Sequence, residues 1–142
     1  MDKQELKKIY QAKKEKKGKS SDGEIITSQQ GFKSTTWEQF EAWFKQEEFD
    51  KGCHYCGTKN EESLRLYNLR PHATRGGKRG KRLEIDRREP ARDYDETDNL
   101  VWACYWCNNA KSNFFSEEEF KPIAFVIGEV LNSIINKSNK KS

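Results

Sequence analysis

Apolar residues are scarce in this chain of 142 residues, of which 33% are of hydrophobic types. An average soluble domain contains about 45–50%. No apolar run approaches the roughly 20 residues of a membrane-spanning helix, which excludes an ordinary transmembrane protein. The length is that of one domain with tails. Because so few apolar side chains make a small core, we expect a bound metal, a partner chain or both to support it.

Histidine and cysteine are also rare, with two and four residues respectively. All four cysteines fall in two C-x-x-C pairs, Cys53/Cys56 and Cys104/Cys107. This spacing predicts a structural zinc site, in which each pair forms a tight turn and one tetrahedral Zn²⁺ joins the turns. The alternative is two disulfides in a secreted protein. Because the first residues do not resemble a secretion signal, we expect a cytoplasmic protein with reduced cysteines.

Charge is unevenly distributed, although the net value is only +4. Residues 1–19 contain eight lysines and three acidic residues, and residues 65–92 contain ten basic and three acidic residues. Basic blocks of this kind are typical of a surface that binds nucleic-acid phosphates, and the alternative is an ordinary solvated surface. The residues of the second block that we expect to contact DNA are Arg75, Lys78, Arg79, Lys81 and Arg82.

Two oxygen ligands accompany the cysteines. Asp86 ends a short apolar run, and Asn108 directly follows the last cysteine. Carboxylate and amide oxygens suit Mg²⁺ or Mn²⁺, so we predict a catalytic divalent ion here. Lys111 lies one helical turn beyond Asn108, and we expect it to face the same phosphate backbone. The alternative is that Asp86 is a turn residue and Asn108 a helix cap.

Residues 52–116 resemble the HNH endonucleases of the ββα-metal type. The shared pattern is a C-x-x-C pair, a strand ending in Asp-(His/Arg), an asparagine in the next loop, and C-x-x-C-N-x-x-K. The resemblance implies an α+β fold with a ββα-metal core stapled by zinc and flanked by helices. It also implies that Asp86 and Asn108 hold the catalytic ion and that Asn99 braces the hairpin loop. The implied reaction is hydrolysis of DNA to 5′-phosphate and 3′-hydroxyl ends.

Arg87 departs from the commonest form of this pattern, which has a histidine acting as general base. Arginine stays protonated and cannot accept the proton of the attacking water. A subgroup of dimeric restriction enzymes also carries Asp-Arg, and the resemblance to it implies that Arg87 binds phosphate. The base must then come from elsewhere. We rank His72 first, because it lies near the glycine-rich cationic segment of residues 75–82, His54 second, and a mechanism without a protein base third.

The chain divides into four parts. Residues 1–23 are expected to form a basic arm or helix, residues 24–50 a helical segment, residues 51–116 the HNH core, and residues 117–142 a helix with a polar tail. The apolar spacing of Leu6, Ile9 and Tyr10 predicts a short amphipathic helix in the first part.

Three further elements are predicted from local patterns. Residues 35–49 are expected to form a helix capped by Thr35 or Thr36, and residues 24–27 a short strand. Residues 64–85 are interpreted as the arm of a β-hairpin, with a strand over residues 81–86.

The C-terminal helix is expected from Phe114 onward, with Ser116 and Glu119 as its capping box and Pro122 as a kink or restart. We expect its apolar face to mediate dimerisation. That face comprises Phe120, Ile123, Ile127, Val130, Leu131 and Ile134.

The sequence therefore predicts a homodimeric, metal-dependent HNH DNA endonuclease with a role in restriction or phage defence. A non-catalytic zinc module that binds DNA through a degenerate HNH site is the main alternative. A nuclease that acts on RNA is a third.

Overall fold

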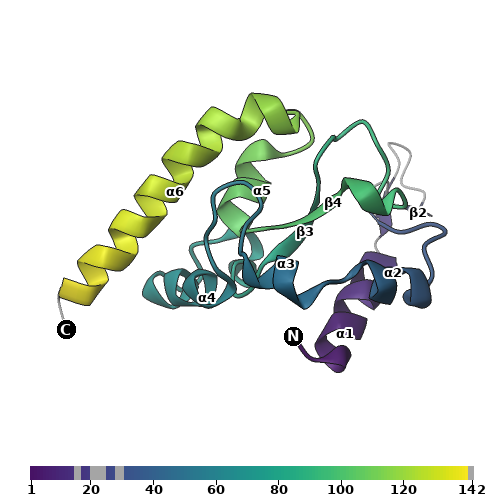
Figure 1. Ribbon diagram of the computed structural model, residues 1–142, viewed down its shortest axis with the longest axis horizontal. Coiled ribbons are helices and arrows are strands. Elements are labelled where there is room, and N and C mark those ends of the chain that lie inside the picture. Colours follow the sequence, from purple (N-terminus) through teal and green to yellow (C-terminus); the bar gives the residue numbers. More distant parts are fainter. Residues whose placement is uncertain (15–16, 20–24, 28–30, 141–142) are drawn as a thin grey trace.

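The computed structural model describes residues 1–14, 17–19, 25–27 and 31–140. Helices surround a small two-stranded sheet in a mixed α+β arrangement, as expected (Figure 1). The helices are α1 (Lys3–Lys14), α2 (Trp37–Trp43), α3 (Gln46–Asp50), α4 (Asn60–Leu69), α5 (Tyr105–Lys111) and α6 (Glu117–Lys140), with two short 3-10 turns, η1 (Arg75–Gly77) and η2 (Thr97–Asn99).

The central sheet consists of β3 (Glu84–Arg87) and β4 (Leu100–Ala103), which pair antiparallel with Ile85 opposite Trp102. Successive side chains of a strand point to opposite faces, so Glu84 and Asp86 share one face. Helix α5 follows β4 directly and packs against β3. Its side chains reach that face, because Asn108 and Lys111 contact the two carboxylates.

Aromatic side chains from the N-terminal helices pack around Trp102 of β4. Its ring lies 5.7 Å from that of Trp43 and 5.0 Å from that of Phe49. Leu6, Ile9 and Tyr10 are buried on one side of α1, which confirms the predicted amphipathic helix. The N-terminal helices therefore supply most of the aromatic core that supports the sheet.

The predicted helix over residues 35–49 is present as two shorter helices. Thr36 caps α2 through a capping box with Gln39, as the sequence indicated. The backbone becomes extended at Phe44, and α3 begins two residues later. The turn places Phe44 and Phe49 on either side of the break, and both rings contact Trp102.

The predicted hairpin arm at the start of residues 64–85 is wrong, because helix α4 covers residues 60–69. Ser63, Leu66 and Tyr67 are buried at helical spacing, whereas Leu64 and Leu69 are 44% and 42% exposed. The strand partner of β3 is β4, which lies later in the chain. The predicted strand over residues 81–86 is observed as Glu84–Arg87.

Helix α6 begins with the predicted capping box, in which Ser116 and Glu119 each accept a hydrogen bond from the other's backbone N–H, at 3.2 and 2.9 Å. It continues through Pro122 to Lys140, over residues expected to form a polar tail; residues 141–142 lie outside the described residues. Part of the predicted dimerisation face is wrong, because Phe120 and Leu131 are buried within the chain. The exposed apolar side chains of α6 are Phe125, Val126 and Val130.

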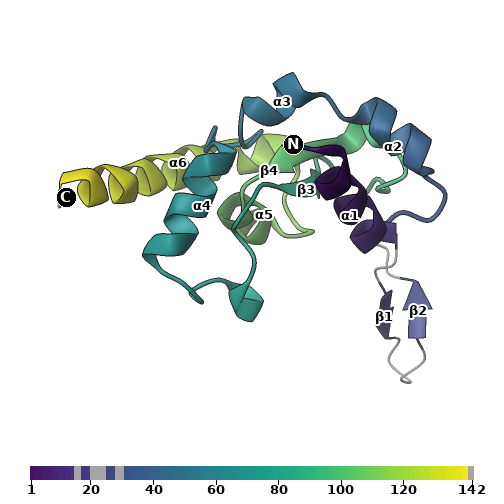
Figure 2. The same cartoon turned by 90° about the horizontal axis from the view of Figure 1, so that it is seen from below.

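Strands β1 (Lys17–Lys19) and β2 (Ile25–Thr27) form a separate antiparallel pair, which extends away from the other elements in Figure 2. β2 agrees with the strand predicted near residue 25. The remaining residues of the expected basic arm, 15–16 and 20–23, lie outside the described residues. None of the described helices, α6 included, is long and apolar enough to cross a membrane.

Candidate metal centres and active site

The four cysteines converge at one point of the fold. Their sulfur atoms all lie within 4.8 Å of one another, and those of Cys56 and Cys104 are 3.7 Å apart. Tetrahedral Zn²⁺ with Zn–S bonds of about 2.3 Å places its sulfurs about 3.8 Å apart. The cluster therefore fits a zinc ion. All four residues are free thiols in the structure, which does not support the disulfide alternative.

We call the turn that contains Cys53 and Cys56 the first knuckle and the turn that contains Cys104 and Cys107 the second. Two glycines shape the first knuckle. Gly52 adopts φ +89°, and a Cβ atom there would lie 2.6 Å from the carbonyl oxygen of Thr58. The backbone N–H of Cys53 donates to this carbonyl at 2.8 Å, and that of Gly57 donates to Cys53 at 2.8 Å. The turn thus brings Cys53 and Cys56 to the same side. The His54 N–H donates to Trp102 at 2.8 Å, which attaches the knuckle to β4.

The second knuckle coincides with the start of α5. Cys104 occupies the N-cap position, and its sulfur accepts the N–H of Cys107 at 3.4 Å. Contacts with the sulfurs of Cys104, Cys53 and Cys56, together with burial, raise the pKa of the Cys107 thiol. Four thiolates this close therefore require a cation to ionise together, which is the electrostatic condition that zinc meets.

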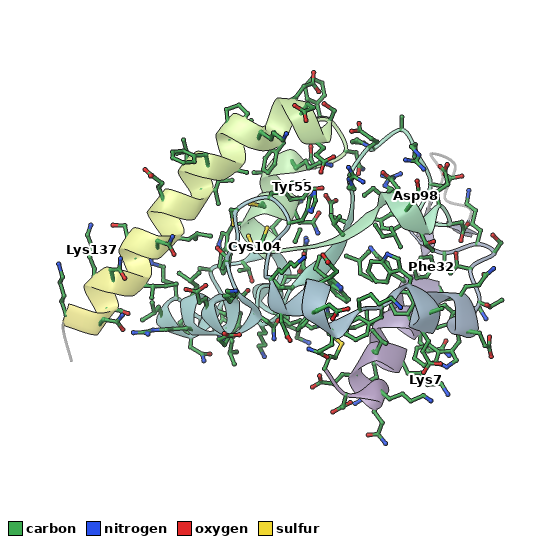
Figure 3. The ribbon with its side chains drawn as sticks, in the orientation of Figure 1. Lys7, Phe32, Tyr55, Asp98, Cys104 and Lys137 are labelled. Carbon is green, nitrogen blue, oxygen red and sulfur yellow. The ribbon has the colours of Figure 1, made fainter. Side chains whose placement is uncertain are left out.

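Asp86 is buried and is linked to the first knuckle through Tyr55. It is 5% exposed, and its Oδ2 atom accepts a 2.6 Å hydrogen bond from the Tyr55 hydroxyl. The Lys111 ammonium lies 3.4 Å from the same oxygen. Burial raises the pKa of Asp86, and the charge of Lys111 and the Tyr55 bond oppose that shift. Tyr55 comes from the first knuckle, and Figure 3 labels it together with Cys104 of the second knuckle.

Lys111 occupies a different position from the one expected. Its side chain is fully buried, and its ammonium donates a 2.7 Å hydrogen bond to the Arg87 carbonyl as well as pairing with Asp86. A buried ammonium with these partners supports the carboxylate and does not reach DNA phosphates in this structure.

Arg87 is also buried, with 7% of its surface exposed. Its guanidinium donates to the Asn113 amide oxygen at 3.0 Å and to the Arg92 carbonyl at 3.3 Å, and it stacks over the Tyr94 ring at 4.9 Å. These partners engage part of the guanidinium, which carries five N–H donors, and the expected phosphate contact stays a prediction.

Asn99 closes the loop between the two strands. Its buried amide accepts a 2.9 Å hydrogen bond from the Glu89 N–H and donates a 3.0 Å bond to the Glu89 carbonyl. The Arg88 N–H donates to the Asn99 carbonyl at 2.8 Å. These three bonds hold the loop after Asp86 in one conformation.

Asn108 faces a cleft of about 430 Å³ between α1, the cationic segment, β3 and α5. Its amide nitrogen donates a 3.0 Å hydrogen bond to Glu84, which also pairs with Arg79 at 2.6 Å. The cationic residues that line the cleft are Lys13, Arg75, Arg79 and Arg82. Of the predicted DNA contacts, Lys78 and Lys81 are exposed outside this lining, and Lys81 stacks over Tyr67 at 5.2 Å.

The two histidines lie in different surroundings. His72 adopts φ +67° in the loop after α4, where its imidazole faces Gly77 of the cationic segment. His54 forms a hydrogen bond with Glu117 at the start of α6, and its ring centroid is 5.2 Å from that of Tyr55. Of the two, His54 is therefore connected through Tyr55 to Asp86.

Sequence reasoning missed Tyr55 and Glu84. Tyr55 lies between two predicted zinc ligands, so its spacing from Cys53 and Cys56 indicates proximity to the zinc but not to Asp86. Glu84 precedes Asp86 by two residues, and strand periodicity alone places both on one face. That pattern was available in the sequence but was not used.

The fold, the cysteine cluster and the hydrogen-bonded asparagines define a protein similar to the HNH nucleases. No family model matches the chain, and no curated protein does either. Among solved structures, it is similar to the rare-cutting HNH restriction endonuclease PacI, with a TM-score of 0.55 and 28% sequence identity. The match covers 68% of this chain and 64% of the PacI chain. Together with the cysteine cluster, it supports the HNH, PacI-like resemblance.

Proposed function

We propose that this protein is a metal-dependent DNA endonuclease with an HNH ββα-metal core formed by β3, β4 and α5. The observation that carries the proposal is the placement of Asp86 and Asn108 on the packed elements β3 and α5, with Asn108 lining a cationic cleft. PacI is a restriction endonuclease of the HNH type, and its likeness to this chain supports the same class of reaction. A restriction or phage-defence role and a cytoplasmic location complete the proposal.

Asp86 and the amide oxygen of Asn108 would hold Mg²⁺ or Mn²⁺, whose preferred ligands are oxygen atoms. The ion, when bound, stabilises charge that develops on the phosphate and the leaving oxygen. Lys111 and Tyr55 favour the charged form of the buried Asp86 carboxylate and oppose the rise in its pKa that burial causes. Asn99 holds the loop that follows Arg87, through bonds with Arg88 and Glu89.

The substrate would enter along the cationic cleft. Arg75, Arg79 and Arg82 provide three guanidinium groups around one hollow, and Lys13 adds a fourth positive charge from α1. Arginine binds phosphate oxygens through paired N–H donors, so the lining suits a nucleic-acid backbone. Exposed Lys78 and Lys81 would extend the surface beyond the cleft.

For the group that accepts the proton of water, the contacts favour His54 over His72. His54 is hydrogen-bonded to Glu117, and a carboxylate partner fixes the orientation of an imidazole. It also adjoins Tyr55, which bonds Asp86. His72 is placed beside the cationic segment, and its predicted role as base is retained as the competing assignment.

Nicking of supercoiled plasmid with Mg²⁺ or Mn²⁺ tests the main proposal, with EDTA and Asp86→Ala as controls. We expect metal-dependent nicking by the wild-type protein and none in either control. A single-stranded RNA tests the alternative that the protein is a nuclease that acts on RNA. Faster cleavage of RNA than of plasmid DNA would assign the activity to RNA.

A zinc module that binds DNA without cutting it is the second candidate. It is favoured by the burial of Asp86, whose Oδ2 atom is already engaged by Tyr55 and Lys111. Such a protein would bind plasmid and release no nicked product at any Mg²⁺ or Mn²⁺ concentration.

We also propose a homodimer, formed through the exposed apolar side chains Phe125, Val126 and Val130 of α6. Light scattering after size exclusion tests it. We expect the wild-type protein to have a mass near twice 16.7 kDa. The double variant Phe125→Asp, Val130→Asp should have the mass of a single chain. A monomeric wild-type protein at micromolar concentration would contradict it.

A further inference from the structure

Glu84 is the acidic residue among those that line the cationic cleft. Its carboxylate makes two contacts there: it accepts a 3.0 Å hydrogen bond from the Asn108 amide nitrogen, and it pairs with the Arg79 guanidinium through 2.6 and 3.1 Å bonds. Its side chain is 16% exposed. A carboxylate placed in this way has a fixed orientation, because two parallel N–H bonds from arginine hold its plane.

The contact with Glu84 determines which end of the Asn108 amide faces the carboxylate. An ionised carboxylate only accepts hydrogen bonds, so the NH₂ group must be the end that faces it. The amide oxygen of Asn108 is then directed away from Glu84. The terminal torsion of asparagine is broad and roughly two-fold, so without a partner the NH₂ and the oxygen exchange places at little cost.

An ion ligated by Asn108 requires the oxygen and is repelled by the NH₂ group. A partner that accepts from the NH₂ therefore selects the ligating orientation before the ion arrives. Outer partners of this kind commonly change metal affinity by about 10–100-fold when removed. Asp86 lies on the same face of β3 and is engaged by Tyr55 and Lys111, so Glu84 is the carboxylate on this face that contacts Asn108.

We propose that Glu84 is a positioning residue for the divalent-ion site, holding the Asn108 amide so that its oxygen is presented to Mg²⁺ or Mn²⁺. This inference rests on the proposed endonuclease function. Glu84 acts through its hydrogen bond and does not ligate the ion. Arg79 neutralises the Glu84 charge and fixes its side chain, which keeps the carboxylate on Asn108.

Binding of Mn²⁺ to the full-length, zinc-loaded protein without DNA tests this role, measured as free Mn²⁺ by electron paramagnetic resonance. Glu84→Ala removes the acceptor and is expected to weaken Mn²⁺ binding about 10–100-fold. Glu84→Gln keeps an oxygen that accepts from Asn108 and is expected to bind Mn²⁺ close to the wild-type affinity. Glu48→Ala, which removes a surface carboxylate paired with Lys51, is the matched control and should have no effect.

The Asn108→Ala background separates positioning from a direct effect. If Glu84 acts only through Asn108, then adding Glu84→Ala to Asn108→Ala should not weaken Mn²⁺ binding further. An additional loss of Mn²⁺ affinity in the double variant would overturn the positioning role, and so would an equal loss in Glu84→Gln and Glu84→Ala. Either result would show that Glu84 ligates the ion or acts on it through its charge. Wild-type Mn²⁺ affinity in Glu84→Ala would overturn the positioning role too.

Different results would overturn the proposed endonuclease function and the proposed role of Glu84. A wild-type protein that neither binds Mn²⁺ nor nicks plasmid would overturn the endonuclease proposal, and this inference with it. A wild-type protein that nicks plasmid while Glu84→Ala binds Mn²⁺ normally would overturn only the role of Glu84. Zinc content and circular dichroism of each variant must equal those of the wild type for the comparison to be made. Should Glu84→Ala lose zinc, Glu84→Met takes its place, because it fills a similar space and also lacks an oxygen acceptor for the Asn108 NH₂ group.

Discussion

The Tyr55 hydroxyl donates a 2.6 Å hydrogen bond to Oδ2 of Asp86, and this bond joins the two candidate metal sites. Tyr55 lies between Cys53 and Cys56, so the geometry of the cysteine cluster determines where its ring lies. The ring also packs edge-on against Phe120 of α6, at 5.4 Å between centroids. A change at the zinc site therefore reaches Asp86 through a single side chain.

We predict that zinc is required for folding, because the cysteines join two knuckles in a chain with few apolar residues. Metal analysis should find about one Zn²⁺ per chain. Cys104→Ser removes a fully buried ligand and should give an unfolded or insoluble product. Tyr55→Phe keeps all four ligands and should retain zinc and the far-ultraviolet circular dichroism of the wild type. A soluble, folded Cys104→Ser protein without zinc would contradict the assignment.

Asp86→Ala and Asn108→Ala should each abolish cleavage while leaving DNA affinity nearly unchanged. The cleft cations, which would provide most of the DNA affinity, remain in both variants. The measurements are plasmid nicking and fluorescence anisotropy with a labelled duplex. If either variant nicks plasmid in Mg²⁺ at a rate close to that of the wild type, the assignment of that residue to the divalent ion is wrong.

Local patterns account for the parts of the molecule that the sequence predicted. The C-x-x-C spacing and the Ser116–Glu119 capping box depend on residues a few positions apart, and both have the expected geometry. The α1 helix was equally readable from the spacing of Leu6, Ile9 and Tyr10.

The errors arise where burial depends on distant partners. Residues 64–85 were interpreted as a hairpin arm, yet the face of α4 that packs against the protein carries Leu66 and Tyr67, and Leu64 and Leu69 remain exposed. The partners of Lys111 are Asp86 and the Arg87 carbonyl, 25 and 24 residues earlier, which no short pattern shows. The spacing of Lys111, one helical turn beyond Asn108, therefore suggested a position facing DNA phosphates.

The salt dependence of DNA binding should distinguish the cationic segment from Lys111. Replacing Arg75 and Lys78, both exposed, with alanine should weaken binding to every sequence and flatten the log–log salt slope by roughly 0.9 for each lost phosphate contact. Lys111→Met should leave the slope unchanged, because the ammonium is fully buried. A flatter slope for Lys111→Met would place that side chain on DNA, as the sequence first suggested.

The Lys111→Met variant should also move the pH dependence of Mn²⁺ binding. Burial raises the pKa of Asp86, and Lys111 and Tyr55 lower it. Without the ammonium the pKa of Asp86 rises further, so a higher pH is needed to form the carboxylate that ligates the ion. The acidic limb of the Mn²⁺-binding profile should therefore move to higher pH. Tyr55→Phe should move it in the same direction. A shift of either variant to lower pH would show that Asp86 does not govern the limb.

Cleavage rates of variants at the two histidines should identify the general base. Arg87 cannot accept a proton, and imidazole can do so near neutral pH. His54 is bonded to Glu117 and adjoins Tyr55, whereas His72 faces Gly77 in the cationic segment. We expect His54→Ala to slow cleavage by about 10²–10⁴, the usual contribution of a general base.

His72→Ala is the matched variant and should cut within a few-fold of the wild-type rate, since its loss leaves the His54–Glu117 pair intact. Arg87→His, which restores the commonest arrangement of the HNH pattern beside Asp86, should partly rescue His54→Ala. Single-turnover cleavage from pH 5.5 to about 9 covers the range in which imidazole changes protonation. Slow cleavage in His72→Ala with a normal rate in His54→Ala would return the role to His72. Normal rates and pH profiles in both variants would exclude a histidine base, because the chain contains only these two.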